Sequence, residues 1–101
     1  MLFAITLMDR PDHGDLRKSL RAEHRDYLAN VADSFAFAGP LTKDDGETMI
    51  GSLLVIDFPS RDAAHAWLAG EPFTRAGLYA STAVHAFANR WPQKAGFPDV
   101  A

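Results

Sequence analysis

Short apolar runs alternate with two helical patterns along this chain, in an order that few folds accommodate. Between Leu16 and Val31, apolar residues recur every three or four positions, a spacing that gives an α-helix one apolar stripe. A second helical pattern follows Ser60, the predicted N-cap, and stops at Gly70. Four apolar runs have the length of strands: Leu2–Met8, Ser34–Ala38, Met49–Phe58 and Tyr79–Ala88. The predicted order is therefore β-α-β-β-α-β.

This order predicts one α+β domain with a ferredoxin-like plait. Gly39-Pro40 is expected to end the second strand, and Asp45-Gly46 is a strong turn signal for an antiparallel hairpin. We expect the helical crossovers to join parallel neighbours, which gives a four-stranded mixed sheet with both helices on one face. A chain of 101 residues has room for one such domain, predicted over residues 1–91, with an extended tail over 92–101.

The predicted strands are apolar on both faces. In the first strand Phe3, Ile5 and Leu7 share one face, while the opposite face is also largely apolar. Two helices cover only one side of a four-stranded sheet. We therefore expect a second copy to cover the other side, in a homodimer that pairs through its sheet faces across a two-fold axis.

Composition narrows the class of protein. Thirteen acids against ten bases give a net charge of -3, and we find no basic stripe of the kind that binds nucleic acid. The absence of cysteine excludes disulfides, thiolate catalysis and cysteine-type zinc sites, and it fits a reducing cytoplasm. No apolar run approaches the roughly 18 residues of a membrane span. We expect a soluble, cytoplasmic protein that binds neither nucleic acid nor membrane.

His24 is the first candidate functional residue. It completes the apolar stripe between Leu20 and Leu28, so a titratable imidazole is expected to face the protein interior. The alternative is a structural histidine satisfied within the core. The charged residues of the same helix are expected mostly on its solvent side: Arg17, Lys18, Arg21, Glu23, Arg25 and Asp26.

Three further features could carry chemistry. They are Asp44-Asp45 in the loop after the second strand, Ser52 on an apolar strand, and Glu71-Pro72-Phe73 after the second helix. Each has a structural alternative: a turn, a small core filler and the cap of a helical turn, respectively. Taken together, they predict an acid/base pair, because an aspartate that holds one imidazole N–H fixes the tautomer and makes the ring a better base. Ser52 would then orient a substrate oxygen.

Two other site types are disfavoured. His24 has no histidine three or four residues away, and the remaining histidines are scattered, so no metal site is expected. Ser52 lacks the Gly-x-Ser-x-Gly elbow of a serine nucleophile.

Several segments together resemble the YCII-related (YciI-like) proteins, small dimeric members of the α/β-plait group. The match is in order and nearly ungapped from about Met1 to Trp91. It is carried by RAEHRDYL (residues 21–28), FAGPL (37–41), DDG (44–46), GSLLV (51–55) and EPFTRAGLY (71–79).

The resemblance implies a ferredoxin-like fold, dimerisation through the sheets and a pocket with a histidine–aspartate pair. The histidine corresponds to His24, and the aspartate to Asp45 or, less favoured, Asp44. We expect the substrate-binding residues to be Ser52, Arg21, Pro40, Glu71 and Phe73. The family usually has Asp-Pro-Tyr or Asp-Pro-Phe where this chain has Glu71-Pro72-Phe73, so the carboxylate side chain here is the longer one.

One branch of the family resembles a dehydrochlorinase acting on a chlorinated hydroxyquinol, and related plait dimers include isomerases of lactones. The resemblance thus implies an enzyme that needs no cofactor and acts on a small aromatic, quinol or lactone-like substrate by elimination or isomerisation. The alternative is a non-catalytic dimer that binds a small molecule or regulates through the same pocket. A structural partner module is a third, weaker hypothesis.

Overall fold

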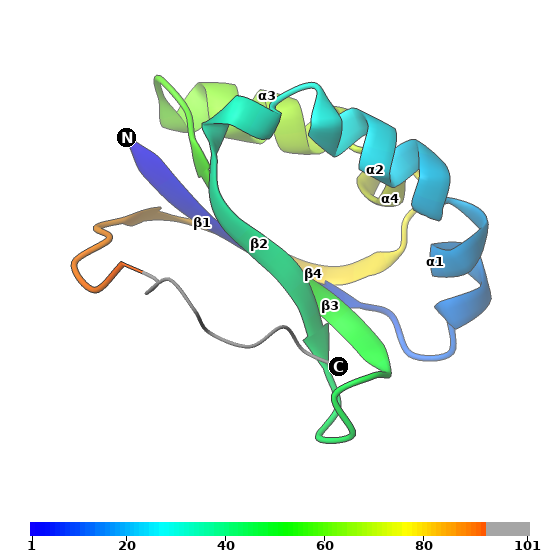
Figure 1. Cartoon of the computed structure of the whole chain (residues 1–101). Helices are drawn as coiled ribbons and strands as arrows, with labels where there is room; N and C mark the ends of the chain where they lie inside the picture. The colour runs from blue at the N-terminus through cyan, green and yellow to red at the C-terminus, as the bar shows by residue number, and fades with distance from the viewer. Residues whose placement is uncertain (93–101) are drawn as a thin grey trace.

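The computed structural model describes residues 1–92, and the strands within them form one twisted sheet with helices on one side (Figure 1). The strands are β1 (Leu2–Asp9), β2 (Phe35–Thr42), β3 (Met49–Asp57) and β4 (Tyr79–Phe87). The helices are α1 (Gly14–Ser19), α2 (Arg21–Ala29), α3 (Arg61–Gly70) and α4 (Pro72–Arg75), with a 3₁₀ turn, η1, at Ala32–Ser34. The predicted β-α-β-β-α-β order is confirmed, with each helical segment divided in two.

The sheet has the strand order β2-β3-β1-β4, and every neighbouring pair is antiparallel. Ile5 of β1 lies opposite Leu54 of β3 and Val84 of β4. The prediction of a mixed sheet is therefore wrong. A helical crossover does make β1 parallel to β2, but β3 lies between them and runs the opposite way, so no parallel pair is adjacent.

β2 is longer than the sequence predicts. It continues through Gly39 and Pro40 to Thr42, with Pro40 opposite Ser52 of β3. β2 is an edge strand, where the missing N–H of proline need not interrupt the ladder. Gly39-Pro40 therefore lies within the strand and does not end it.

The predicted first helix is broken at Leu20, which ends α1 and precedes α2. Leu16, Leu20 and Leu28 nevertheless pack together on the core, as their spacing predicts. In α3, the Ser60 side chain accepts a hydrogen bond from the Ala63 amide, which confirms Ser60 as the N-cap.

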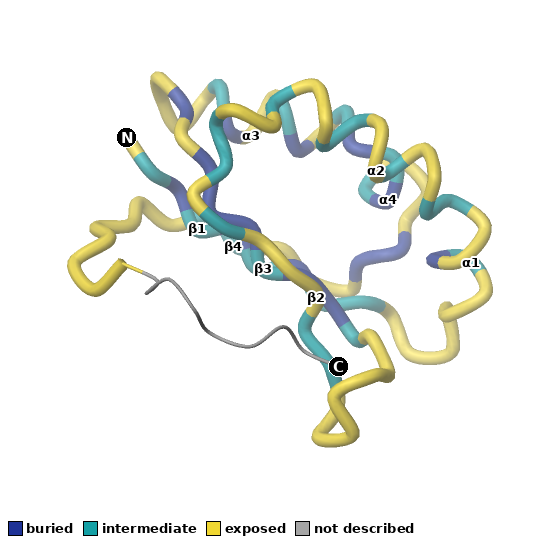
Figure 2. The backbone as a smooth tube through the Cα atoms, viewed as in Figure 1, coloured by how far each residue is buried: buried dark blue, intermediate teal, exposed yellow. Residues whose placement is uncertain are grey.

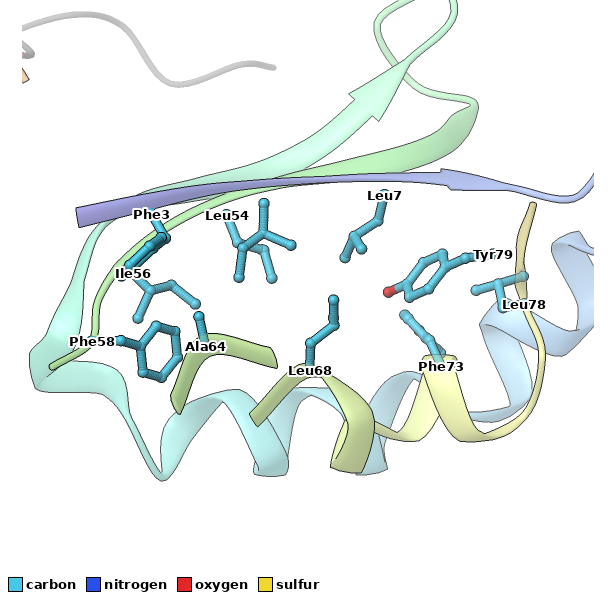
Figure 3. Packing of buried hydrophobic residues seen from close by; sticks show 11 residues of the cluster. Phe3, Leu7, Leu54, Ile56, Phe58, Ala64, Leu68, Phe73, Leu78 and Tyr79 are labelled. Atoms are coloured by element: carbon cyan, nitrogen blue, oxygen red, sulfur yellow. The ribbon is translucent and has the colours of Figure 1, made fainter. Parts of the chain in front are cut away.

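The core lies between the sheet and the helices (Figures 2 and 3). Alternate residues of β1 and β3 point to α3 and α4, where they meet Ala64, Leu68 and Phe73. The buried cluster lies on this side of the sheet. Along β1, buried residues alternate with half-buried ones (Figure 2). The alternation predicted for Phe3, Ile5 and Leu7 is confirmed.

Two predictions, the extended tail and the homodimer that pairs through its sheet faces, are not tested by the described residues. Apart from Pro92, the predicted tail over 92–101 lies outside the described residues. The outer face of the sheet, opposite the helices, carries half-buried apolar side chains, among them Ala4, Met8 and Leu53.

Within residues 1–92, no helix has the length and apolar character needed to cross a membrane.

Candidate active site

A cavity of about 290 Å³ lies between the first helical pair, α1 and α2, and the strands β2 and β3. Its polar wall consists of Arg17, Arg21, Arg25, His24 and Ser52. Its apolar wall includes Leu28, Pro40, Met49, Leu54 and Phe73. The cavity thus combines an apolar surface with a few converging polar groups, as small-molecule sites commonly do.

His24 forms the centre of this arrangement. Its side chain is 12% exposed, and its ring stacks on Phe73 with centroids 4.1 Å apart and planes 14° apart. Nδ1 lies 2.5 Å from Oε1 of Glu71. An ionised carboxylate can only accept hydrogen bonds, so Nδ1 carries the hydrogen and donates it. Nε2 has no hydrogen-bond partner among residues 1–92, and it is the nitrogen left for a ligand in the cavity.

Glu71 is fully buried, and each of its oxygens is held by several donors. Besides His24, it accepts hydrogen bonds from the Phe73 and Thr74 amides, both at 3.0 Å. The Tyr79 hydroxyl also donates to it, at 3.3 Å, from within the core cluster (Figure 3). These donors satisfy a charge that would otherwise be costly to bury.

The charge state of Glu71 follows from this environment. Burial by itself raises the pKa of the Glu71 carboxyl, but the hydrogen bond from His24 and the bonds from the Phe73 and Thr74 amides outweigh it. The pKa therefore lies below its ordinary value. Burial and the nearby Glu71 charge raise the pKa of Tyr79, so this phenol stays protonated and remains a donor. Glu71 is thus an ionised acceptor at neutral pH.

The local sequence explains how Glu71 comes to lie there. Glu71 is the N-cap of α4, and Pro72 occupies the first turn, where proline costs no hydrogen bond. The capping role that the sequence suggested for Glu71 is confirmed, and the same carboxylate also reaches His24. Glu71 does not line the cavity, so the expected direct contact with substrate is replaced by a position behind His24.

The predicted contact between His24 and Asp45 or Asp44 is wrong. Asp45 is exposed, and its carboxylate accepts bonds from the Glu47 and Thr48 amides and from the Thr48 hydroxyl. Asp44 is exposed in the same turn. Because β2 runs on to Thr42, the hairpin turn projects beyond the sheet and away from α2 (Figure 1). The structural alternative, a turn, describes both aspartates.

Arg17 was expected on the solvent side of its helix but is buried. Its guanidinium makes two hydrogen bonds to Asp9 at the end of β1, at 2.7 and 2.9 Å. Nη2 also lies 3.3 Å from Oγ of Ser52, and the guanidinium carbon lies 4.9 Å from the centre of the Phe73 ring. A signal was available in the sequence, because Arg17, Arg21 and His24 share one helical face by their spacing of four and seven residues.

The structure therefore brings most of the predicted site residues to one cavity: His24, Ser52, Arg21, Pro40 and Phe73. It adds Arg17, which Asp9 of β1 holds in place, and it replaces the expected aspartate with Glu71 as the partner of His24. In the described part of the chain, no three histidine, aspartate or glutamate side chains gather closely enough to hold a metal ion.

Comparison with known proteins identifies the family of the chain. Residues 1–88 match the family described as the YCII-related domain. The chain belongs to the YCII-related family. It is 32% identical to Protein YciI of Escherichia coli over 94 residues, which spans 86% of this chain and 96% of that protein. Protein YciI of Shigella flexneri matches with the same identity and coverage.

Among solved structures, the chain is similar to the 5-chloro-2-hydroxyhydroquinone dehydrochlorinase of Burkholderia phenoliruptrix, in its complex with 2,5-dihydroxybenzoquinone. The TM-score is 0.81 and the sequence identity is 34%, with 87% of this chain and 94% of the dehydrochlorinase covered. The ferredoxin-like fold and the YCII relationship predicted from the sequence are both confirmed.

Proposed function

We propose that this protein is a cofactor-independent enzyme that acts on a small organic molecule by proton transfer at His24. The observation that carries the proposal is the His24–Glu71 pair beside a cavity. A buried, ionised carboxylate holds Nδ1–H, while Nε2 keeps its lone pair and has no partner among the described residues. This arrangement provides a general base of fixed tautomer and orientation.

In an elimination, Nε2 of His24 takes a proton from the substrate. The electron pair left behind forms a new double bond as the bond to the leaving group breaks, and the leaving group departs as an anion. The imidazolium, stabilised by Glu71, then passes its proton to water. In an isomerisation, the same imidazolium returns the proton to another carbon of the substrate.

The substrate class rests on the dehydrochlorinase, which acts on a chlorinated hydroxyquinol and was solved with a quinone bound. The cavity of this chain has a size suited to one ring, and Phe73, Leu54 and Leu28 offer apolar contacts to such a ring. We propose a small aromatic or quinol-like substrate.

The proposed active form is a homodimer that pairs through the outer faces of the sheets. Apolar side chains such as Ala4, Met8 and Leu53 project from this face, which the helices of the same chain leave uncovered. A second copy would bury them across a two-fold axis.

The test of the proposed chemistry is His24→Asn, with 5-chloro-2-hydroxyhydroquinone as the probe substrate and chloride release as the readout. General-base catalysis contributes on the order of 10²- to 10⁴-fold, and we expect a loss of that size. His65→Asn is the matched control, because His65 is an exposed histidine of α3 outside the cavity. Thermal melts establish that both variants fold.

Three results would decide against the proposal. Turnover by folded His24→Asn at the wild-type rate would remove His24 from the chemistry. Equal losses in both histidine variants would indicate a nonspecific effect. Binding of 2,5-dihydroxybenzoquinone by a wild-type protein that turns over neither chlorinated nor unchlorinated quinols would favour the non-catalytic binding dimer.

A further inference from the structure

The charge of the cavity differs in sign from that of the whole chain. The chain has thirteen acids against ten bases, yet among the residues that line the cavity within 1–92, every permanently charged side chain is an arginine. Arg17 of α1 and Arg21 and Arg25 of α2 all line the cavity, so the helical pair turns three guanidinium groups to the same side.

The three arginines are not equivalent. Asp9 holds Arg17 with two hydrogen bonds, so this guanidinium is neutralised and fixed. Arg21 and Arg25 have no carboxylate within 4.0 Å in the described part of the chain. Arg21 is half-buried, whereas Arg25 is exposed. The uncompensated positive charge of the cavity is therefore held by Arg21, with Arg25 at its rim.

Ser52 lies next to this charge and has a hydrogen to donate. It is 4% exposed, and its oxygen accepts a hydrogen bond from Nη2 of Arg17 at 3.3 Å. A hydroxyl that accepts from one side still has its own O–H, and among residues 1–92 this O–H has no acceptor. Arg17 thus orients Ser52 so that its hydrogen is available to an acceptor within the cavity.

The volume and the apolar wall of the cavity suit a ligand with one ring. A dry cavity of about 150 Å³ holds one benzene molecule. The cavity here measures about 290 Å³, which leaves room for one ring and its substituents. Phe73 and Leu54 provide the apolar contact.

We infer that the ligand is a single-ring molecule with an ionised oxygen, either a carboxylate or the enolate of a hydroxyquinone. Arg21 pairs with this oxygen, the Ser52 hydroxyl donates to it, and Arg25 attracts the anion to the rim. The inference rests on the proposed function, because it places the ring of the substrate of His24. It also adds a reason for the choice of substrate: a guanidinium beside an anionic ring stabilises the negative charge that grows when His24 removes a proton.

The experiment compares an anion with its neutral isostere, benzoate with benzamide, by equilibrium dialysis. 2,5-Dihydroxybenzoquinone is the third probe and represents the enolate source. The proteins are the wild type, Arg21→Gln and the matched control Arg90→Gln, which replaces an exposed arginine outside the cavity lining. Each measurement is repeated at about 0.01 M and about 0.1 M salt, since the Debye length falls from about 30 Å to about 10 Å between them.

We expect at least one of the two anions to bind about tenfold or more tightly than benzamide, the size of effect that a charge-assisted hydrogen bond gives. Arg21→Gln should weaken the binding of that anion by about tenfold and leave the binding of benzamide unchanged. Arg90→Gln should bind the anion as the wild type does. Added salt should weaken the binding of the anion and leave the binding of benzamide unchanged. The anion that binds more tightly identifies the carboxylate or the enolate as the source of the charge.

Equal affinity for benzoate, 2,5-dihydroxybenzoquinone and benzamide would overturn the inference. So would equal losses in Arg21→Gln and Arg90→Gln, or no anion binding at concentrations up to about 10 mM. These results are separable from the proposed chemistry. If His24→Asn keeps its turnover while Arg21→Gln loses anion binding, the chemistry fails and the anion site stands; the reverse pattern leaves the chemistry and removes the anion site.

Discussion

At the scale of single residues, the site depends on a carboxylate that the ligand does not touch. Glu71 is fully buried, caps α4 through the Phe73 and Thr74 amides, and accepts the Nδ1 hydrogen of His24. One side chain therefore links the start of a helix to the orientation of the proposed base. Any change at Glu71 should affect stability and activity together.

Glu71→Gln tests this coupling. The amide nitrogen of glutamine is a donor. At the Oε1 position it opposes His24 and the Phe73 amide, and at the Oε2 position it opposes the Thr74 amide. We expect a loss of about 1–3 kcal/mol in the free energy of unfolding, measured with urea at neutral pH, because a buried group becomes unsatisfied. Turnover should fall by roughly 10²-fold or more, since the imidazole is no longer held in one tautomer.

The pH dependence of the same variant follows from the lowered pKa of Glu71. A carboxyl with a lower pKa in the folded state stabilises the protein fully above its unfolded pKa, and this stabilisation is lost as the pH falls through the folded pKa. The difference in unfolding free energy between wild type and Glu71→Gln should therefore shrink below about pH 4.3. Glu71→Asp is the control that retains the charge. A difference that grows on acidification would contradict the proposed charge state.

The site residues also show which side-chain positions a local sequence pattern can predict. The inward position of His24 follows from the spacing of Leu20 and Leu28, which is a local property of one helix. Its partner lies 47 residues away, and that contact depends on how α2 and α4 pack, which no local pattern encodes. Arg17 shares a helical face with His24, but its burial also needs a carboxylate outside the helix, and Asp9 at the C-terminal end of β1 provides it.

At the scale of elements, the local sequence determines the turn of the β2–β3 hairpin. The Asp45 carboxylate accepts hydrogen bonds from the Glu47 and Thr48 amides. Gly46 has a φ of 72°, in the left-handed region that favours glycine. The turn was predictable from Asp45-Gly46. The continuation of β2 through Pro40 was not, because whether a strand lies at an edge depends on the strand order of the whole sheet.

Asp45→Ala separates the turn from the site. Three hydrogen bonds, led by the one from the Thr48 hydroxyl, lower the pKa of Asp45 to about 2. The turn is therefore stabilised fully above about pH 3.9, and this stabilisation is lost as the pH falls towards about 2. We expect a lower melting temperature for the variant at neutral pH and a difference that shrinks as the pH falls towards about 2 and disappears below it. Binding of 2,5-dihydroxybenzoquinone should be unchanged; its loss would restore Asp45 to the site.

At the scale of the whole molecule, the two faces of the sheet differ in what covers them. The side covered by helices holds the core and the cavity. The outer side presents apolar side chains that the helices cannot reach, and this mismatch predicts the homodimer. The fold class was predictable because six elements in this order leave few arrangements. The all-antiparallel pairing was not predictable, because it depends on β3 lying between β1 and β2 in the sheet.

The dimer is tested by Leu53→Arg. Leu53 projects from the centre of β3 on the outer face, opposite Thr6 of β1 and Gly39 of β2. Two arginines brought together across a two-fold axis would repel and would lose the solvation of their charges. Light scattering coupled to size exclusion should give twice the 11.1 kDa chain mass for the wild type and the chain mass for the variant. Ala66→Arg, on the exposed side of α3, is the control and should stay dimeric. A monomeric wild type, or a Leu53→Arg variant that remains a dimer, would place the interface elsewhere or remove it, and the outer face would then need another explanation.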